Sequence, residues 1–408
     1  MKKITYCIFS LCLSFLLFCA ESTYAYAESQ SNSYDMSQNA ENQSVEINAP
    51  SAILMEAKTG KVIYEKNPDE IRSPASITKI MTMLLAFEAL EKGKINLQDE
   101  VVTSAYAKSM GGSQVFLEEG EVQTVDTLLK CIAVASGNDA SVCMAEHIGG
   151  TEGEFVNLMN EKAAELGMDN THFMDCCGLS NSDEHYTTAR DVAVMSRELI
   201  TKYPQVFAYT TIWMEDITHI TNKGESTFTL SSTNKLLKQY PYANGLKTGS
   251  TDKAKYCLSA TALKDDIQLI AVVMAAPDYK VRFEDCRNLL NYGFAKVHFY
   301  EDEKKENLAV VPVRGGVDRE TMVEYKNAFV YLELEGNDVS QISKEELVPE
   351  FVEAPLKKGD KVGIVNYYLG EKQIGQVELV VCQDLEKAGF ADYFKRGFGK
   401  WLLGRENL

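Results

Sequence analysis

The stretch Pro-Ala-Ser-Ile-Thr-Lys-Ile-Met-Thr-Met-Leu-Leu-Ala-Phe, residues 74–87, places Ser76 and Lys79 at the start of a long apolar run. Residues 77–90 carry apolar side chains at helical spacing, and the proline before them suits a helix N-terminus. Side chains three residues apart share one face of a helix, so the Ser76 hydroxyl and the Lys79 amine should lie together. Backbone N–H groups at a helix N-terminus concentrate positive potential, which favours a neutral amine. The stretch therefore predicts a helix that opens with a serine–lysine pair.

A second motif, Ser-Gly-Asn at residues 136–138, supplies partners for this pair. A serine hydroxyl is a poor nucleophile and needs a base, and a neutral lysine amine can accept its proton near pH 7. The Ser136 hydroxyl can pass that proton to a leaving amine. The Asn138 amide can hold Lys79 and the backbone of a substrate. We therefore expect Ser76, Lys79 and Ser136 to act together in acyl transfer, and Asn138 to bind substrate.

The third motif, Lys-Thr-Gly at residues 247–249, lies in a strand-like run. Lys247 would present a positive charge, and Thr248 a hydroxyl, to a substrate carboxylate. The glycine lets a substrate chain approach the strand closely. The backbone N–H groups of Ser76 and Ser250 would form an oxyanion hole. We therefore expect Lys247, Thr248 and Ser250 to bind substrate.

Each motif taken alone also has an ordinary structural explanation. Ser76 could cap a helix beside a solvated lysine, the Ser-Gly-Asn tripeptide is turn-like, and a lysine on an edge strand is common. Ser-x-x-Lys recurs at residues 232–235 and 250–253, and Lys-Thr-Gly recurs at residues 58–60 between two strand-like runs. Only Ser76 opens a helical run with both other motifs downstream, so the ordered set favours the catalytic interpretation.

The ends and the charge of the chain indicate an exported protein. The chain has 408 residues and a net charge of −18, which argues against a nucleic-acid partner. Two early lysines, an apolar run over residues 6–20 and an Ala-Tyr-Ala site predict a cleaved signal peptide over residues 1–27. A retained membrane helix is the alternative, although the apolar run is short for a span. Residues 28–45 are rich in Ser, Asn and Gln and predict a flexible spacer.

The fold class that follows is α+β, with an antiparallel sheet flanked by helices over residues 46–299. Predicted strands cover residues 52–56, 61–65, 245–249, 256–262 and 267–275, and predicted helices cover residues 77–90, 125–136, 140–148, 152–167, 188–203 and 282–294. Short β-rich stretches at residues 308–313, 329–334, 361–369 and 373–381 predict a second, small all-β domain over residues 300–383. Residues 384–408 predict an amphipathic helix with aromatic and basic residues, which fits a membrane-surface anchor. A helix packed on the protein is the alternative.

Cysteine and histidine spacing predicts no metal site. Seven of the ten cysteines follow the predicted signal peptide, and neither they nor the five histidines have ligand spacing. Cys131, Cys143 and Cys257 lie in apolar runs and are typical of small core residues. For the other cysteines the sequence leaves both free thiols and a disulfide as alternatives. We expect no metal and no cofactor.

Four stretches carry a resemblance to a known family: Pro-Ala-Ser-Ile-Thr-Lys at residues 74–79, Ser-Gly-Asn-Asp-Ala at 136–140, His-Tyr-Thr-Thr-Ala-Arg-Asp at 185–191 and Gly-Leu-Lys-Thr-Gly at 245–249. In these the chain resembles the low-molecular-mass penicillin-binding proteins that act as D-alanyl-D-alanine carboxypeptidases. Serine, lysine and Lys-Thr-Gly motifs of this type mark the penicillin-binding proteins and class A β-lactamases. The resemblance covers about residues 46–383, and the predicted helical tail fits it too.

The resemblance implies a β-lactamase/transpeptidase-like fold and a role in cell-wall remodelling. The substrate would be a peptidoglycan stem peptide, which loses its terminal D-alanine through an acyl-serine intermediate, and β-lactams would inhibit the reaction. The protein would work at the outer face of the cytoplasmic membrane, in peripheral contact through its C-terminal helix. Arg282 would correspond to a family arginine near the carboxylate site.

Two other functions fit the sequence less well. A class A β-lactamase usually has Asp at the position of Gly137 and needs a Glu followed four residues later by Asn, whereas Glu165 and Asn170 are five apart. A catalytically inactive wall-binding protein is the other alternative, and an intact Ser76 with both lysines argues against it.

Overall fold

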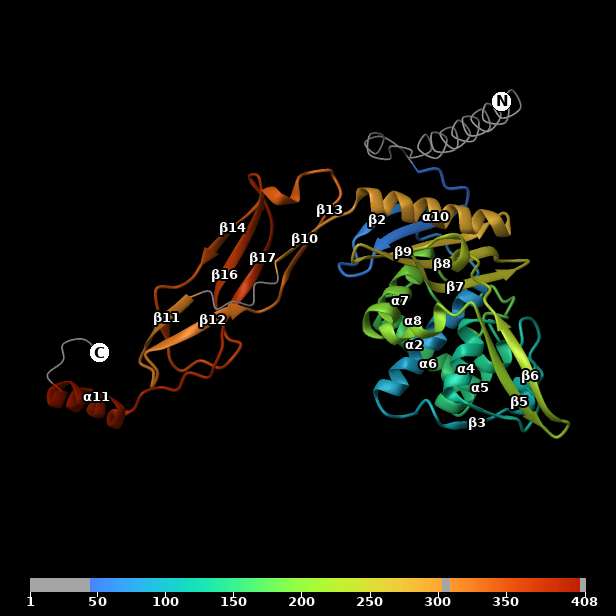
Figure 1. Ribbon diagram of the computed structural model, residues 1–408, viewed down its shortest axis with the longest axis horizontal. Helices are drawn as coiled ribbons and strands as arrows, with labels where there is room; N and C mark the ends of the chain where they lie inside the picture. The colour runs from blue at the N-terminus through green and yellow to red at the C-terminus, as the bar shows by residue number, and fades with distance from the viewer. Residues whose placement is uncertain (1–44, 303–308, 404–408) are drawn as a thin grey trace, which may run out of the picture. The chain divides into compact units, whose positions relative to one another are not determined.

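The computed structural model describes residues 45–302 and 309–403, and its core is a five-stranded antiparallel sheet (Figure 1). The predicted signal peptide and the predicted spacer up to residue 44 lie outside the described residues. The sheet order is β2-β1-β9-β8-β7. Its strands are β1 (Ser51–Glu56), β2 (Val62–Lys66), β7 (Ala243–Thr251), β8 (Lys255–Lys264) and β9 (Ile267–Ala276). The first and last of these strands pair directly, with Ser51 opposite Met274, so the two ends of this region lie side by side in the sheet.

Helices cover both faces of this sheet, as predicted. They are α2 (Lys79–Glu91), α4 (Val125–Ala133), α5 (Asn138–Gly149), α6 (Glu152–Glu165), α7 (Ala189–Lys202) and α10 (Tyr279–Lys296), with short α3 (Ala105–Lys108), α8 (Phe207–Thr210) and α9 (Leu236–Gln239). In Figure 1, α10 lies on one side of the sheet and α7 and α2 lie on the other. Because both faces are covered, the central strands β8 and β9 are buried along most of their length.

Helix α2 is the centre of the helical layer. Every residue from Lys79 to Phe87 is buried, so this helix contacts protein on all sides. Two details differ from the predicted helix. Ser76 lies in a single 3₁₀ turn, η1 (Ala75–Thr78), and α2 begins only at Lys79. Ala75 has a left-handed backbone with φ of 46°, so regular helical backbone cannot continue in front of Ser76.

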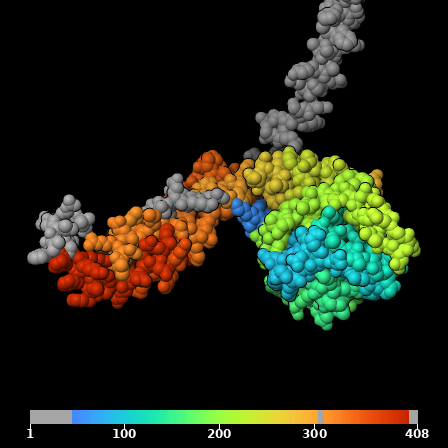
Figure 2. All heavy atoms as spheres, turned by 60° about the horizontal axis from the view of Figure 1, so that its bottom comes forward, coloured from blue at the N-terminus to red at the C-terminus, as the bar shows by residue number. Residues whose placement is uncertain are grey.

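Two antiparallel strand pairs were not predicted. They are β3 (Glu100–Val102) with β4 (Val122–Thr124), and β5 (Met214–Thr221) with β6 (Gly224–Ser231). Strands β5 and β6 bury few residues, chiefly Ile217, His219 and Leu230, so their sequence carries no apolar run. Figure 2 shows the yellow-green atoms of this region beside the blue and teal atoms of the earlier helices.

The later part of the chain is all-β and ends in a helix. Strand β10 (His298–Asp302) pairs with β13 (Phe329–Glu333). A six-stranded sheet has the order β14-β16-β17-β12-β11-β15, from β11 (Ala309–Arg314), β12 (Glu320–Tyr325), β14 (Ile342–Leu347), β15 (Val352–Glu353), β16 (Lys361–Leu369) and β17 (Lys372–Val381). Phe329 of β13 and Tyr367 of β16 form a stacked aromatic pair in the core of this region, with ring centroids 3.7 Å apart. Helix α11 (Phe390–Leu403) follows, which confirms the predicted C-terminal helix.

All seven described cysteines are free thiols, and six of them are buried. Cys131, Cys143 and Cys257 lie in the core, as predicted. None of the helices in the described ranges is long and apolar enough to cross a membrane.

Candidate active site

The amine of Lys79 is the centre of the candidate site. Lys79 is completely buried, and its Nζ lies 3.0 Å from Ser76 Oγ, 2.6 Å from Asn138 Oδ1 and 2.7 Å from the backbone oxygen of Cys177. Two of these partners, the amide oxygen and the carbonyl oxygen, can only accept hydrogen bonds. A neutral amine that donates its two N–H groups to them has its lone pair left for the third direction, toward the Ser76 hydroxyl.

Burial is the main influence on the charge of Lys79. It lowers the pKa of this amine from its usual range, because the charged form loses its water. Nearby acidic groups oppose the shift: the two thiols of Cys176 and Cys177 and the carboxylates of Asp175 and Asp139. The net direction is downward, which favours a lysine that can accept a proton near neutral pH.

The turn that carries Ser76 is shaped by close backbone packing. The glycine of the third motif, Gly249, touches this turn: a Cβ atom there would lie 2.9 Å from the oxygen of Pro74. Gly178 lies closer still, because a Cβ atom there would lie 1.8 Å from the oxygen of Ala75. Strand β7 and the loop after α6 therefore hold the serine turn between them.

Ser136 and Lys247 form a second hydroxyl–amine pair. Lys247 Nζ donates to Ser136 Oγ over 2.8 Å and to the oxygen of Thr248 over 3.1 Å. Lys247 is buried, and burial lowers its pKa well below the usual range, with further lowering from the charges of Lys79 and Arg282. A positive charge on Lys79 therefore disfavours a second positive charge on Lys247. Ser136 itself has a left-handed backbone, with φ of 60°.

Asn138 joins the site to a loop that sequence reasoning missed. Its Nδ2 donates to the oxygen of Gly111 over 2.7 Å, and its backbone N–H donates to the oxygen of Ser113 over 2.7 Å. The next residue, Asp139, is buried and accepts from the backbone N–H groups of Val115 and Leu117. Residues 111–117 are thus fixed beside the second motif. Backbone acceptors have no side-chain signature, so only the two glycines in this loop could have suggested it.

Thr248 and Ser250 lie on β7, which is an edge strand of the sheet. Thr248 Oγ1 donates to Thr233 Oγ1 over 2.7 Å. Thr233 belongs to the Ser-x-x-Lys tetrapeptide at residues 232–235. This tetrapeptide therefore supplies a hydrogen-bond partner for Thr248 and does not supply a second serine–lysine pair. Ser250 is exposed just after the motif. The outer edge of β7 pairs with no strand in the part of the chain that the structure describes.

Arg282 reaches the end of the Lys-Thr-Gly motif from α10. Its Nη1 donates to the oxygen of Gly249 over 3.2 Å, and its guanidinium lies 4.8 Å from the ring centroid of Phe283. Its Nε is buried with no hydrogen-bond partner among the described residues. Burial lowers the pKa of this guanidinium from its usual value. The structure therefore brings Arg282 to the strand that carries Lys247.

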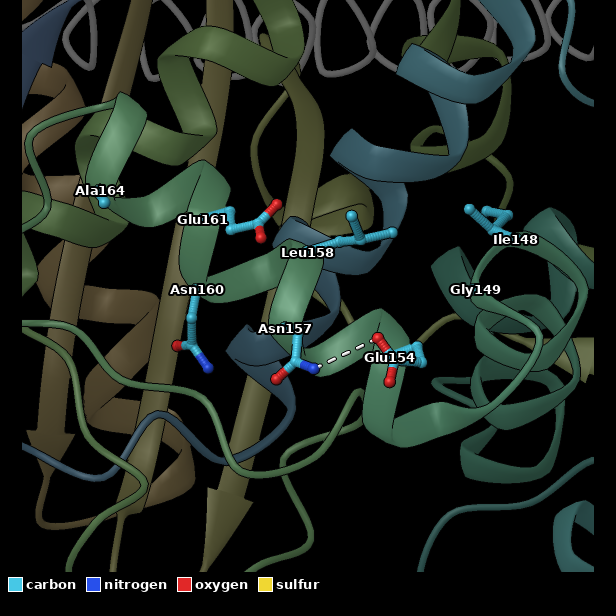
Figure 3. A pocket seen from close by; sticks show the side chains of 8 residues that line it. All are labelled: Ile148, Gly149, Glu154, Asn157, Leu158, Asn160, Glu161 and Ala164. Atoms are coloured by element: carbon cyan, nitrogen blue, oxygen red, sulfur yellow. Dashed lines mark hydrogen bonds between the residues drawn. The ribbon is translucent and has the colours of Figure 1, made fainter.

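A separate depression lies on the outer side of α6 (Figure 3). It is lined by Ile148, Gly149, Glu154, Asn157, Leu158, Asn160, Glu161 and Ala164. The figure shows Glu154 hydrogen-bonded to Asn157 and no amine among the lining side chains. This depression therefore lacks the groups for acyl transfer. No group of His, Cys, Asp or Glu within the described ranges is arranged to hold a metal ion.

Comparisons with known protein families match two parts of the chain. Residues 36–278 match the family described as D-alanyl-D-alanine carboxypeptidase, peptidase S11. Residues 294–387 match the family described as penicillin-binding protein 5, C-terminal domain.

Individual relatives and solved structures are similar over most of the chain. A D-alanyl-D-alanine carboxypeptidase of Bacillus subtilis, DacF, is 42% identical over 354 residues, covering 86% of this chain and 90% of the relative. DacA of Escherichia coli K12 is 34% identical over 377 residues, covering 88% and 89%. The crystal structure of penicillin binding protein 5 from Haemophilus influenzae has a TM-score of 0.73 at 30% identity. The match covers 85% of this chain and 100% of that chain.

Proposed function

The chain belongs to the D-alanyl-D-alanine carboxypeptidase family of serine hydrolases, and we propose that it removes the terminal D-alanine of peptidoglycan stem peptides with Ser76 as nucleophile. The observation that carries this assignment is the buried amine of Lys79, held by Asn138 and by the carbonyl of Cys177 with Ser76 Oγ at 3.0 Å. This arrangement is what a serine needs to lose its proton at neutral pH.

The proposed reaction has two halves. Ser76 Oγ attacks the carbonyl carbon of the penultimate D-alanine, and its proton passes to Lys79. The peptide C–N bond breaks as the leaving D-alanine amine takes a proton by way of the Ser136 hydroxyl. Water then attacks the ester on Ser76 and releases the shortened peptide, and the serine regains its proton. A β-lactam ring would acylate the same oxygen and leave an ester that water removes slowly.

The substrate would lie along the edge of β7. Backbone groups of an extended peptide can pair with the open strand edge. Lys247 and Thr248 would bind the terminal carboxylate, with Arg282 behind them at the Gly249 carbonyl. A bound carboxylate favours the charged form of Lys247, which leaves Lys79 as the neutral member of the pair. The backbone N–H groups of Ser76 and Ser250 would stabilise the oxyanion.

The position of Glu165 does not support the β-lactamase alternative, which needs a glutamate to activate the deacylating water. This residue ends α6, is largely exposed and accepts a hydrogen bond from Lys162 over 2.6 Å. It is therefore engaged on the outside of the helix.

The assignment is tested by incubation with a stem pentapeptide and by labelling with penicillin. We expect the wild type to release one D-alanine and to gain one covalent adduct by intact-mass measurement. Ser76→Ala should do neither. Ser232→Ala is the matched control, because Ser232 has the same Ser-x-x-Lys spacing and its Oγ accepts from Asn234 instead of a lysine. An adduct that persists on Ser76→Ala would point to another nucleophile.

We further propose export and attachment to the outer face of the cytoplasmic membrane. The predicted signal peptide over residues 1–27 supports export. The exposed aromatic side chains of α11 support surface attachment: Phe390, Tyr393, Phe394 and Phe398. The proposed division of the chain is a serine peptidase domain over residues 46–299, a small all-β domain over residues 300–383 and an amphipathic anchor over residues 384–408.

A further inference from the structure

The loop that follows α6 is gathered around one carboxylate. Asp175 accepts hydrogen bonds from the backbone N–H groups of Cys177 over 2.8 Å, Leu179 over 3.3 Å and Ser180 over 2.6 Å. It also accepts from the N–H of Gly178. The segment has no helix or strand of its own. Asp175 therefore supplies the hydrogen bonds that regular structure would otherwise supply.

The same loop is packed directly against the proposed nucleophile and base. The carbonyl of Cys177 accepts from Lys79 Nζ over 2.7 Å, and the carbonyl of Cys176 accepts from Thr82 Oγ1 over 2.5 Å. Gly178 lies against the backbone of Ala75, where no side chain fits. A small rotation of the loop would therefore move an acceptor of Lys79.

One peptide group connects Asp175 to Lys79. The carbonyl of Cys177 and the N–H of Gly178 belong to the same planar amide, so the orientation of one fixes the other. The N–H points to Asp175, and the carbonyl oxygen points to Lys79. A charged acceptor on the N–H also polarises the amide and strengthens its oxygen as an acceptor.

We propose that Asp175 is a positioning residue for the reaction: it fixes the Cys177–Gly178 peptide so that one N–H of Lys79 is bound there and the lone pair is directed at Ser76. The inference rests on the proposed role of Lys79 as base. Asp175 does not touch the substrate or the reacting atoms. It acts through the backbone oxygen of Cys177.

The charge of Asp175 gives the proposal a second readout. The groups that face Lys79 are Asp175, Cys176 and Cys177 from this loop, Asp139 from α5 and Lys247 from β7. His185 faces Asp175; burial lowers the pKa of this imidazole. Its Nδ1 accepts from the N–H of Met174 over 2.9 Å, so its Nε2 donates to Thr78 Oγ1 over 2.9 Å. Because Asp175 favours the charged form of Lys79, loss of its charge should make the lysine lose its proton at lower pH.

Three variants test the proposal: Asp175→Ala, Asp175→Asn and Asp183→Asn as the matched control. Asp183 lies in the following stretch, is almost fully exposed and pairs with Lys253. The measurement is the rate of penicillin acylation from pH 5 to pH 10, with thermal unfolding of each variant. We expect Asp175→Ala to acylate on the order of 10²-fold more slowly, as for a misplaced catalytic group. Asp175→Asn can still accept from Cys177 and Gly178, so it should recover much of this loss, with the acidic limb of its profile moved to lower pH. Asp183→Asn should match the wild type.

Two outcomes would overturn the inference. One is a folded Asp175→Ala with the wild-type rate and profile. The other is an Asp175→Asn whose rate falls in step with its thermal stability and whose pH profile is unmoved, which would make the role purely structural. If the wild type itself forms no adduct on Ser76, the proposed function fails instead, so the two failures are distinguishable.

Discussion

The two lysines of the site have the same chemistry and different neighbours. Lys79 Nζ contacts one hydroxyl and two groups that can only accept, so its neutral form is fully accommodated. Lys247 Nζ contacts Ser136 and the carbonyl of Thr248 on the strand edge, where a substrate carboxylate would supply the missing negative charge. In the proposed mechanism, the surroundings of each lysine, and not the residue type, divide the roles of base and carboxylate anchor.

This division predicts different effects of the same substitution. Lys79→Arg should abolish acylation by penicillin, because a guanidinium stays protonated and cannot accept the serine proton. Lys247→Arg keeps a positive charge and should retain part of the activity, with a raised KM for the stem peptide. The measurement is the acylation rate and the peptide kinetics of both variants. Equal losses in the two would contradict the assignment of base and anchor.

At the scale of elements, the loop after α6 and strand β7 restrain the turn that carries Ser76. Gly178 and Gly167 both have left-handed backbones, with φ of 80° and 70°. A Cβ atom at Gly178 would overlap the oxygen of Ala75, whereas a Cβ atom at Gly167 would meet nothing within 4 Å. The pair therefore separates the effect of crowding from the effect of backbone conformation.

We expect Gly167→Ala to lower the free energy of unfolding by about 1 kcal/mol, the usual penalty for a left-handed alanine. Gly178→Ala should lose about 3 kcal/mol or more beyond that, because overpacking against backbone adds to the same penalty. Urea unfolding of both variants checks this, and penicillin labelling should fall only in Gly178→Ala. Similar losses of stability in the two would mean that the loop yields and does not clamp the turn.

The elements that the sequence predicted are those whose pattern is local. Helices such as α2 and strands such as β8 and β9 have long apolar runs, and the three motifs mark themselves by side-chain type. The contacts of Cys177, Gly178 and Gly111 could not be predicted, because they are made by backbone atoms or by the absence of a side chain. The need for glycine at residue 178 arises from Ala75, which is remote in sequence. The hairpin β5–β6 was missed because its few buried residues give no periodic signal.

At the scale of the whole molecule, the net negative charge of the chain disfavours contact with an anionic membrane, whereas the basic residues of helix α11 favour it. The net charge is −18, while α11 carries Lys395 and Arg396 beside its exposed aromatic face. An anionic lipid surface would repel most of the protein and attract this helix. Within the proposed anchor over residues 384–408, Leu385 is buried in the small β core, so a truncation that spares this core begins at Phe390.

Removal of residues 390–408 should therefore release the protein from membranes and leave hydrolysis of a small soluble peptide nearly unchanged. Phe390→Ser combined with Phe394→Ser should weaken attachment, since each buried aromatic contributes about 1.5–3 kcal/mol. Sedimentation with vesicles that contain anionic lipid measures both effects, and Lys326→Ser, on the surface of the small β region, is a control. Loss of peptidase activity on truncation would show instead that the helix is a structural part of the protein.

The pairing of β1 with β9 sets an order of folding. Ser51 lies opposite Met274, so the sheet joins segments that leave the ribosome far apart in time, and such long-range closure is slow. Strand β7 is connected to β1 only through β8 and β9. Every proposed catalytic side chain from Ser76 to Lys247 is therefore synthesised before the strand that completes the sheet. A nascent chain that ends before β9 holds all the proposed reactive groups but lacks the strand that joins β8 and β7 to β1. The proposed acylation should therefore report on a completed sheet.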